Sequence, residues 1–337
     1  MRSKKTGTCL FVVSTPAQAF FISLAPQLIG TNSILILTIK KKKEEQDILN
    51  YLKSFEWKEV HIWFLPIGNN LIGYLTILSL RLKLLRFKMN SPNIEKVFIG
   101  SYSNIYHLSL SAEFEEKSAI FLLYDGVQII SVADARNNGN FNLVDYPLLH
   151  RILGFSKPKL SSLTYVSPIN LNPISNNDSF FLIENSIVKE NKNYDEDIGY
   201  FIGNNLPGIG IVSREFYLKV LVHIKNTFPN KEIIYIPHPR EDIEILPEIE
   251  KIFEIEKFDK IFEDHFISAR DFPSTVFSFC SSILLNLIFL NTKSEILAID
   301  IPVSEIKLES YKEPIASIYK YYAEITDKRF SLLKLKL

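Results

Sequence analysis

Short runs of apolar residues alternate along the first half of the chain with longer segments in which apolar and polar residues mix. The apolar runs predict buried strands, at residues 9–14, 33–40, 59–65, 96–100 and 118–124. The mixed segments predict helices, at residues 17–28, 43–55, 71–88 and 104–114. Strands that alternate with helices imply a parallel sheet covered on both faces, so residues 1–160 are expected to form one Rossmann-like domain.

The same alternation of apolar runs and mixed segments recurs in the second half and predicts a second Rossmann-like domain over residues 196–310. Its strands are expected at residues 198–202, 231–236, 253–258, 276–280 and 294–301. Its helices are expected at residues 213–227, 242–251 and 283–290. Residues 161–195 are rich in Asn, Ser and Pro and predict a connecting segment that contains two short strands, near Ser162 and Phe180. Residues 311–337 predict a helical tail.

Composition agrees with two globular domains, because the chain has 337 residues, of which 47% are hydrophobic and 23% charged. Lys and Arg together number 38, and so do Asp and Glu. The chain therefore lacks the excess of basic residues that is typical of a protein that binds nucleic acid. Cys9 and Cys280 lie in apolar runs and are expected to be reduced, buried thiols.

A basic start followed by an apolar run could be taken for a signal peptide, but Pro16 and Gln18 interrupt the run. No apolar run reaches the roughly 18 residues of a spanning helix, so a cytoplasmic protein is expected. Two stretches are both basic and apolar, at residues 80–88 and 328–337. Each either lies on an anionic membrane surface or packs as an ordinary amphipathic helix against a core.

Three predicted strands end in polar residues that suit a reaction. Asp125 ends a strand of the first domain and is followed by Gly126, while His238 and the pair Ser281-Ser282 end strands of the second. Ligands of parallel α/β sheets bind beyond the carboxyl ends of the strands, so two facing domains would place these groups on opposite walls of one cleft. Taken singly, each has a common structural role, as a tight turn, a turn residue or a helix cap.

The set suits displacement at a sugar carbon that carries a nucleotide leaving group. Asp125 could act as base toward an acceptor hydroxyl, and His238 could neutralise or protonate the departing phosphate. Ser281 and Ser282 precede a helix whose first N–H groups form an anion site. No Asp-x-Asp pair occupies a comparable strand end, which favours a monophosphate leaving group and no metal ion.

Five sequence strings carry a resemblance to a known family. They are DG at 125–126, YIPHPRE at 235–241, FCSS at 279–282, FVVSTPAQ at 11–18 and YFIGNNL at 200–206. Together and in this order they resemble the bacterial sialyltransferases of glycosyltransferase family 52, of the lipooligosaccharide and capsule type. The resemblance implies a GT-B architecture of two facing Rossmann-like domains. It also implies a CMP-sialic acid donor, inversion at the anomeric carbon, and neither metal nor cofactor.

Carried over by motif, the resemblance makes Asp125 the general base on an acceptor galactose hydroxyl and His238 a contact or proton donor to the CMP phosphate. The other residues that it implies for donor and nucleotide are Gly203, Asn204, Pro239, Glu263, Ser281 and Ser282. Those that it implies for donor or acceptor contacts are Thr15, Pro16, Gln18 and Gly126.

One position departs from the family pattern. The motif often has two acidic residues before the glycine, whereas Tyr124 occupies the first position here. Asp134 or Asp145 in the following segment could therefore contribute to the base.

The sequence thus predicts an inverting, metal-independent sialyltransferase that caps a terminal galactose of a surface glycan. Its partners would be the nucleotide sugar and an oligosaccharide acceptor, with the inner face of the cell membrane and a second copy of the chain as further candidates. The alternatives are a GT-B glycosyltransferase with another nucleotide-activated donor, such as UDP-glucose, and a non-catalytic relative that binds nucleotide or glycan.

Overall fold

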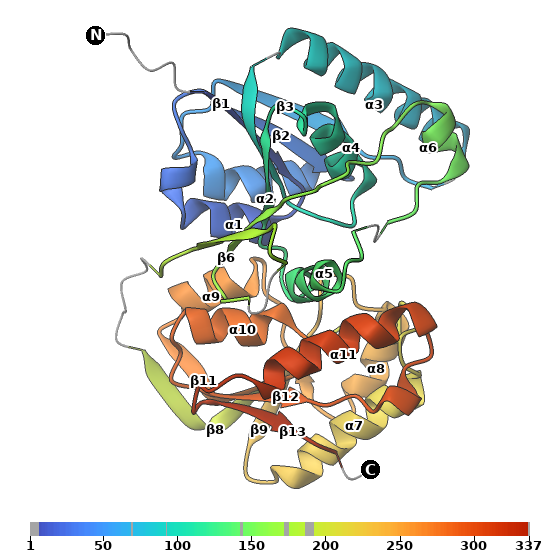
Figure 1. Ribbon diagram of the computed structural model, residues 1–337. Coiled ribbons are helices and arrows are strands. Elements are labelled where there is room, and N and C mark those ends of the chain that lie inside the picture. The colour runs from blue at the N-terminus through green and yellow to red at the C-terminus, as the bar shows by residue number, and fades with distance from the viewer. Residues whose placement is uncertain are drawn as a thin grey trace. The chain divides into compact units, whose positions relative to one another are not determined.

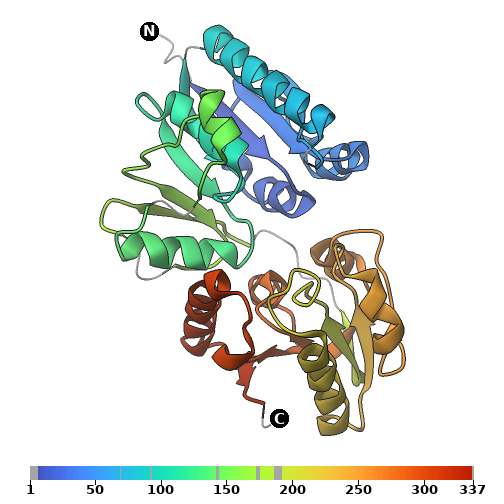
Figure 2. The same cartoon turned by 90° about the vertical axis from the view of Figure 1, so that its right-hand side faces the viewer.

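The chain folds into two compact α/β units (Figures 1 and 2). The computed structural model describes residues 7–68, 70–91, 93–141, 144–171, 175–185 and 192–335. The first unit comprises Met1–Asp125 with Val132–Ser186, and the second comprises Gly126–Ser131 with Ile187–Leu337.

A sheet of seven parallel strands forms the centre of the first unit, in the order β3-β2-β1-β4-β5-β6-β7. The strands are β1 (Thr8–Val13), β2 (Ser33–Ile39), β3 (Glu59–Phe64), β4 (Ile94–Ile99), β5 (Ala119–Leu123), β6 (Thr164–Ser167) and β7 (Ser179–Leu182). The helices are α1 (Pro16–Ser23), η1 (Pro26–Leu28), α2 (Lys42–Leu52), α3 (Leu71–Asn90), α4 (Ile105–Phe114), α5 (Gln128–Asn137) and α6 (Leu148–Ile152). Helices cover both faces of the sheet, so its central strands read as continuous apolar runs (Figure 1).

The second unit contains six parallel strands in the order β10-β9-β8-β11-β12-β13. The strands are β8 (Asn193–Ile202), β9 (Glu232–Ile236), β10 (Glu254–Ile255), β11 (Asp271–Ser278), β12 (Glu295–Ile299) and β13 (Phe330–Leu333). The helices are α7 (Arg214–Thr227), η2 (Ile243–Ile245), α8 (Leu246–Ile249), α9 (Phe262–Ser268), α10 (Ser282–Phe289), η3 (Val303–Glu305) and α11 (Glu309–Ala323).

Both sheets have the same internal order, in which the first strand lies in the interior of the sheet. The chain adds two strands on one side of it and then returns to add the next on the other side. The point of return lies between β1 and β4 in the first unit and between β8 and β11 in the second. Beyond the carboxyl ends of these strand pairs the connections diverge and leave a crevice, which is where such sheets bind ligands.

Four segments differ from the sequence-based expectation. The structure adds helices α5 and α9, which the sequence did not predict, and it breaks the expected helix at 242–251 into η2 and α8. The two short strands expected near residues 162 and 180, by contrast, are present as β6 and β7 and extend the first sheet. The tail at 311–337, expected to be helical, is helical only as far as Ala323, after which β13 pairs in parallel with β12. The basic stretch from residue 328 is therefore part of a sheet.

Candidate active site

At the crevice of the first sheet, the amide of Gln18 joins three strand ends. Its Nε2 donates to the carbonyl of Gly100 and to Oδ1 of Asp125, both at 2.8 Å, and its Oε1 accepts from the backbone N–H of Ser14 at 2.8 Å. The side chain is buried, with 1% exposure. A Cβ at Gly100 would lie 2.2 Å from Oε1 of Gln18, so this close approach requires glycine.

Helix α1 brings Gln18 to this place. Thr15 is its N-cap and accepts from the backbone N–H of Gln18 at 3.2 Å, and Pro16 occupies the first helical position, where no N–H is needed. Of the residues predicted near donor or acceptor, Thr15 and Pro16 thus shape the helix start, and Gln18 contacts the predicted base.

Asp125 follows β5 and is half-buried. Gly126 after it has a φ of +76°, in the left-handed region that favours glycine. Tyr124, which stands where the family often has an acid, is a core residue at 2% exposure and packs edge-on against Phe21 at 4.7 Å between ring centroids. An acid in its place would be buried against an aromatic ring.

The two alternative acids are differently placed. Asp145 has a side chain that is 96% exposed and lies 3.3 Å from Nζ of Lys157. Asp134 is part of α5. Asp125 is the one of the three acids that is held by Gln18 at the crevice.

A buried histidine that the sequence analysis missed lies beside this crevice. His107, on α4, accepts at Nδ1 from the backbone N–H of Ser101 at 3.1 Å, and its Nε2 lies 2.7 Å from both Ser14 Oγ and Thr38 Oγ1. With Nδ1 occupied as an acceptor, the neutral ring carries its proton at Nε2. Burial lowers the pKa of His107 to about 3. The ring therefore directs its N–H toward the hydroxyl oxygens of Ser14 and Thr38 and is not a base that could activate either hydroxyl. Ser101, which follows the strand predicted at 96–100, is the sequence signal that could have indicated this cluster.

In the second unit, Gly203 and Asn204 follow β8 at the crevice. The backbone N–H of Gly203 continues the strand pairing to the carbonyl of Ile236 at 2.8 Å. The hydroxyl of Ser278, at the end of β11, lies 2.8 Å from Oδ1 of Asn204 and so fixes the direction of its amide. A Cβ on Gly203 would lie 2.5 Å from both Tyr235 Oη and Glu241 Oε2, so the loop rests directly on these two side chains.

Beneath this loop runs a hydrogen-bonded chain of polar groups. The backbone N–H of Asn204 donates to Tyr217 Oη at 3.2 Å, and that hydroxyl lies 2.8 Å from Tyr235 Oη. Tyr235 is hydrogen-bonded to the carboxyl of Glu241, which also accepts from the backbone N–H of His238 at 2.9 Å. Burial raises the pKa of Glu241 and of both tyrosines. The chain thus couples the loop after β8 to the loop after β9, and sequence reasoning missed it because its members come from separate elements.

His238 is half-buried at the end of β9. Its Nδ1 accepts from the backbone N–H of Arg240 at 3.1 Å, so the neutral ring carries its proton at Nε2. Burial, and secondarily the charge of Arg240, lower the pKa of His238. At neutral pH the side chain therefore presents an uncharged N–H donor. Pro239, next in the chain, is exposed and contributes the turn.

Ser281 is the N-cap of α10, whose first residue is Ser282. Its hydroxyl accepts from the backbone N–H of Ile283 at 3.4 Å, and its carbonyl accepts from Tyr322 Oη at 2.9 Å. Ser282 is half-buried at the helix start. Burial raises the pKa of the neighbouring Cys280 thiol to about 12, so that cysteine is not a nucleophile at neutral pH.

Glu263, predicted to hold ribose hydroxyls, lies on α9 and is 5% exposed. Its Oε1 accepts from Nδ2 of Asn286 on α10 at 2.5 Å, and burial raises the pKa of the carboxyl. The structure thus gives Glu263 a role in joining α9 to α10.

Within the second unit, β9, β8 and β11 are neighbours. The predicted residues that follow them, Gly203 with Asn204, His238 with Pro239, and Ser281 with Ser282, therefore share one edge of one sheet. Within the first unit, Thr15, Pro16, Gln18 and Asp125 share the corresponding edge of the other.

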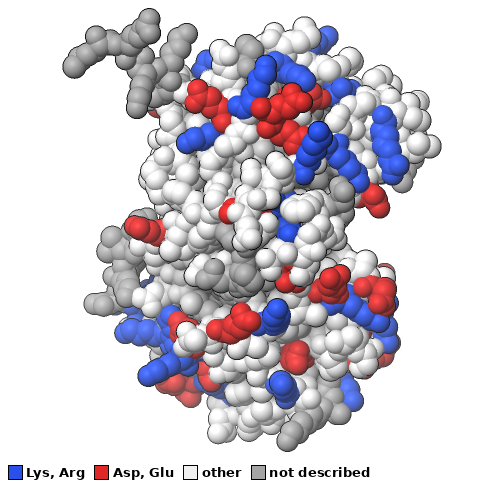
Figure 3. Space-filling model, in the orientation of Figure 1, with Lys and Arg blue, Asp and Glu red and all other residues white. Residues whose placement is uncertain are grey.

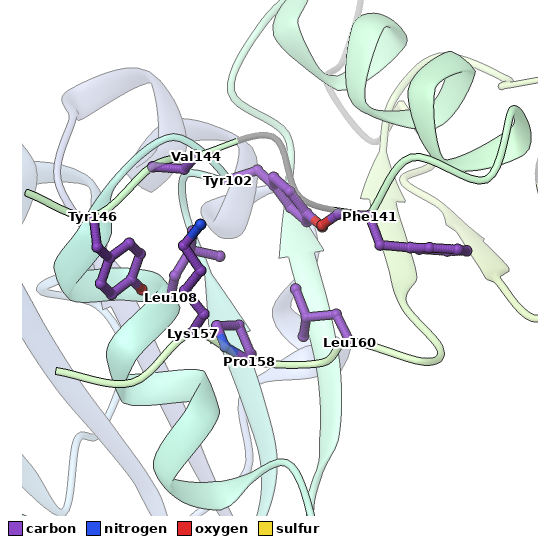
Figure 4. Close-up of a pocket in the computed structure, with 8 residues that line it drawn as sticks. All are labelled: Tyr102, Leu108, Phe141, Val144, Tyr146, Lys157, Pro158 and Leu160. Carbon is purple, nitrogen blue, oxygen red and sulfur yellow. The ribbon is translucent and has the colours of Figure 1, made fainter. Parts of the chain in front are cut away.

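A separate shallow pocket lies in the first unit (Figure 4). Its lining residues are Tyr102, Leu108, Phe141, Val144, Tyr146, Lys157, Pro158 and Leu160. None of these belongs to the predicted site.

The described residues contain no group of three or more His, Cys, Asp or Glu side chains that could hold a metal ion. Among the same residues, no helix has the length and apolar character needed to cross a membrane.

The sequence matches no known family model and no curated protein. The structure is similar to solved structures of UDP-GlcNAc 2-epimerases. One from Methanocaldococcus jannaschii, in complex with UDP-GlcNAc and UDP, has a TM-score of 0.53 and 12% identity, and the match covers 96% of this chain and 94% of that one. Another from Neisseria meningitidis, bound to UDP-GlcNAc, has a TM-score of 0.52 and 10% identity over 94% and 91% of the two chains. The fold class is GT-B. At these identities the likeness establishes the fold, which confirms the expected α/β class with two parallel-sheet units.

Proposed function

We propose that the protein is a glycosyltransferase that uses a nucleotide-activated sugar as donor. The observation that carries this proposal is the shared edge of the second sheet. There a glycine loop, an uncharged histidine N–H donor and the start of α10 follow three neighbouring strands. Backbone N–H groups at a helix start and a neutral imidazole N–H suit the phosphate of a nucleotide.

In the proposed reaction, the carboxylate of Asp125 takes the proton of an acceptor hydroxyl. The hydroxyl oxygen bonds to the anomeric carbon while the bond from that carbon to the phosphate oxygen breaks. His238 Nε2–H and the first N–H groups of α10 stabilise the negative charge that the departing phosphate acquires. Gln18 fixes the orientation of Asp125, as the 2.8 Å hydrogen bond between them supports.

The finer proposal is that the donor is CMP-sialic acid and the acceptor a terminal galactose of lipooligosaccharide or capsule, with inversion and without a metal ion. It is supported by the order of the five strings that resemble family 52. We further place the reaction in the cytoplasm, at the inner face of the cell membrane.

The test is incubation of the full chain with CMP-sialic acid and a lactoside in the presence of a chelator. Release of CMP together with a sialylated lactoside is expected. Absence of turnover over a panel of galactosides would reject the sialyltransferase assignment. His223, on α7, provides a matched control, because His223→Ala should keep the rate that His238→Ala loses.

A UDP-linked donor is the second candidate, since the two structural neighbours named above are solved with UDP-GlcNAc. Ligands that bind only the folded state raise its melting temperature, so thermal shifts with CMP and with UDP rank the two nucleotides. A larger shift with UDP would favour this candidate. If nucleotide binds but no donor is consumed, the chain is instead a binding protein, an alternative that Tyr124 in the acidic motif motivates.

A further inference from the structure

Helix α3 carries two apolar stripes on opposite sides. The inner stripe is buried against the first unit and comprises Gly73, Ile77, Leu80, Leu84 and Phe87. The outer stripe comprises Leu71, Leu75, Leu78, Leu82, Leu85 and Met89, whose exposures lie between 38% and 76%. Within each stripe, successive residues are spaced alternately four and three positions apart. With 3.6 residues per turn, this spacing places the two stripes on opposite sides of the helix.

The outer stripe is unusual for the surface of a soluble protein. Single exposed apolar residues are common, but a continuous row of six long ones marks a surface that contacts something apolar. The row is extended at the start of the helix by Ile72 and Tyr74, with exposures of 73% and 48%. A helix with apolar stripes on two opposite sides is expected to be covered on both of them.

The charged residues of α3 identify the covering partner. The helix contains Arg81, Lys83, Arg86 and Lys88 and no Asp or Glu. By helical periodicity, Lys83 and Arg86 flank the outer stripe on one side, and Arg81 and Lys88 flank it on the other. Arg81 and Lys88 pair with Glu113 at 2.8 and 2.6 Å. In the part of the chain that the structure describes, no acidic side chain lies within ion-pair distance of Lys83 or Arg86.

Two partners could cover such a stripe, a second copy of the helix or a lipid surface. Two copies packed stripe to stripe would bring basic flanks against basic flanks, whereas paired helices use opposite charges beside the seam. An anionic bilayer offers apolar chains to the stripe and negative headgroups to both flanks. Over the part of the first unit along which α3 runs, uncharged surface lies beside Lys or Arg side chains, with some Asp or Glu side chains among them (Figure 3).

We propose that α3 is a membrane-docking helix, which lies in the plane of an anionic membrane surface with its outer stripe in the boundary between headgroups and acyl chains. The helix is about 30 Å long at 1.5 Å per residue, which gives the first unit an extended line of contact. The inner stripe keeps the helix attached to the unit, so the protein lies on the membrane and does not span it.

The experiment is flotation of the full chain with vesicles of phosphatidylcholine alone or of phosphatidylcholine with phosphatidylglycerol. Binding is expected only to the anionic vesicles, and it should weaken as salt is added. Simultaneous Leu75→Ser, Leu78→Ser and Leu82→Ser should abolish binding, and Lys83→Glu with Arg86→Glu should weaken it by more than roughly tenfold. Ile243→Ser with Val303→Ser is the matched control, because these residues are 79% and 58% exposed in the second unit. That control should bind as the unaltered chain does.

Three results would overturn the proposal. One is absence of binding to anionic vesicles, and another is equal binding to both kinds of vesicle. The third is a dimer by light scattering that the triple serine variant converts to a monomer, which would assign the stripe to a second copy. Far-ultraviolet circular dichroism and melting temperature verify that each variant is folded, so that lost binding reports on the surface.

Discussion

The two sheets share a strand order, yet their crevices are built differently. In the first unit one buried amide, that of Gln18, crosses the crevice and satisfies groups from three strand ends. In the second unit the hydrogen bonds that join the loops lie beneath them, through Ser278 and through the chain from Tyr217 to Glu241. The polar groups at the edge of this sheet are N–H donors. The same topology thus holds a carboxylate in place in one unit and presents N–H donors in the other.

The largest expected effect tests the second crevice. His238→Ala removes an N–H donor proposed to stabilise the departing phosphate, and loss of one such donor lowers kcat by about 100- to 1000-fold. Unfolding by urea should be nearly unchanged, because the hydrogen bond that the ring makes within the described residues is a local one, from the backbone N–H of Arg240 two residues on. Initial rates with saturating donor measure the effect. An unchanged rate would remove His238 from the proposed mechanism.

The next effect tests the first crevice and should appear in stability. Gln18→Ala leaves the N–H of Ser14 and the carbonyl of Gly100 without their partner, at a cost of about 3 kcal/mol in the free energy of unfolding. Gln46→Ala on the exposed face of α2 is the control and should change it by less than about 0.5 kcal/mol. Equal losses in the two variants would show that the crevice does not depend on Gln18.

Lowering the pH should reduce the free energy of unfolding through His107, which lies beside the first crevice. Its pKa of about 3 in the folded state lies below the value of about 6.5 expected in the unfolded state. Below pH 6.5 the unfolded chain therefore binds the proton first, and stability falls, by about 2 kcal/mol between pH 7 and pH 5. Urea unfolding at the two pH values should show this loss, and His107→Gln should reduce it by that amount. A loss of the same size in the variant would assign the acid sensitivity to other histidines.

The smallest expected effect tests the start of helix α10 at the second crevice. Ser281→Ala removes the N-cap of α10 and should cost about 1 kcal/mol, whereas Ser281→Gly should cost only a few tenths. The same variants should weaken nucleotide binding in the same order, as measured by calorimetry. Tighter nucleotide binding by Ser281→Ala would show that the N-cap of α10 does not contribute to the proposed phosphate site.

Most strands could be predicted because they are covered on both faces and read as apolar runs, as β2 does with all seven residues buried. Helix α5 could not, because Arg136 anchors it through paired hydrogen bonds of 2.8 and 2.6 Å to Asp178, far along the chain. Strand β13 was read as part of a helical tail, because only its pairing with β12 distinguishes its short apolar stretch from a helix end.

The candidate site shows the same division. Asp125, His238 and Ser281 could be singled out because each follows a strand. Residues that follow parallel strands lie at the carboxyl edge of the sheet, where ligands bind. The roles of Gln18, His107 and Glu241 depend on partners from other elements, such as Asp125 for Gln18 and Ser101 for His107. Pairings of this kind leave no periodic trace in a sequence.

The strand order also has a consequence for synthesis on the ribosome. β8 is made first in its sheet but lies beside β11 in the finished one, and Asp271–Ser278 emerges long after Ile202. At roughly 5–20 residues per second, one edge of this strand stays unpaired for several seconds, as does an edge of β1 until β4 is made. Exposed strand edges recruit other chains. Slower translation should therefore lengthen the time in which these edges can pair with other chains.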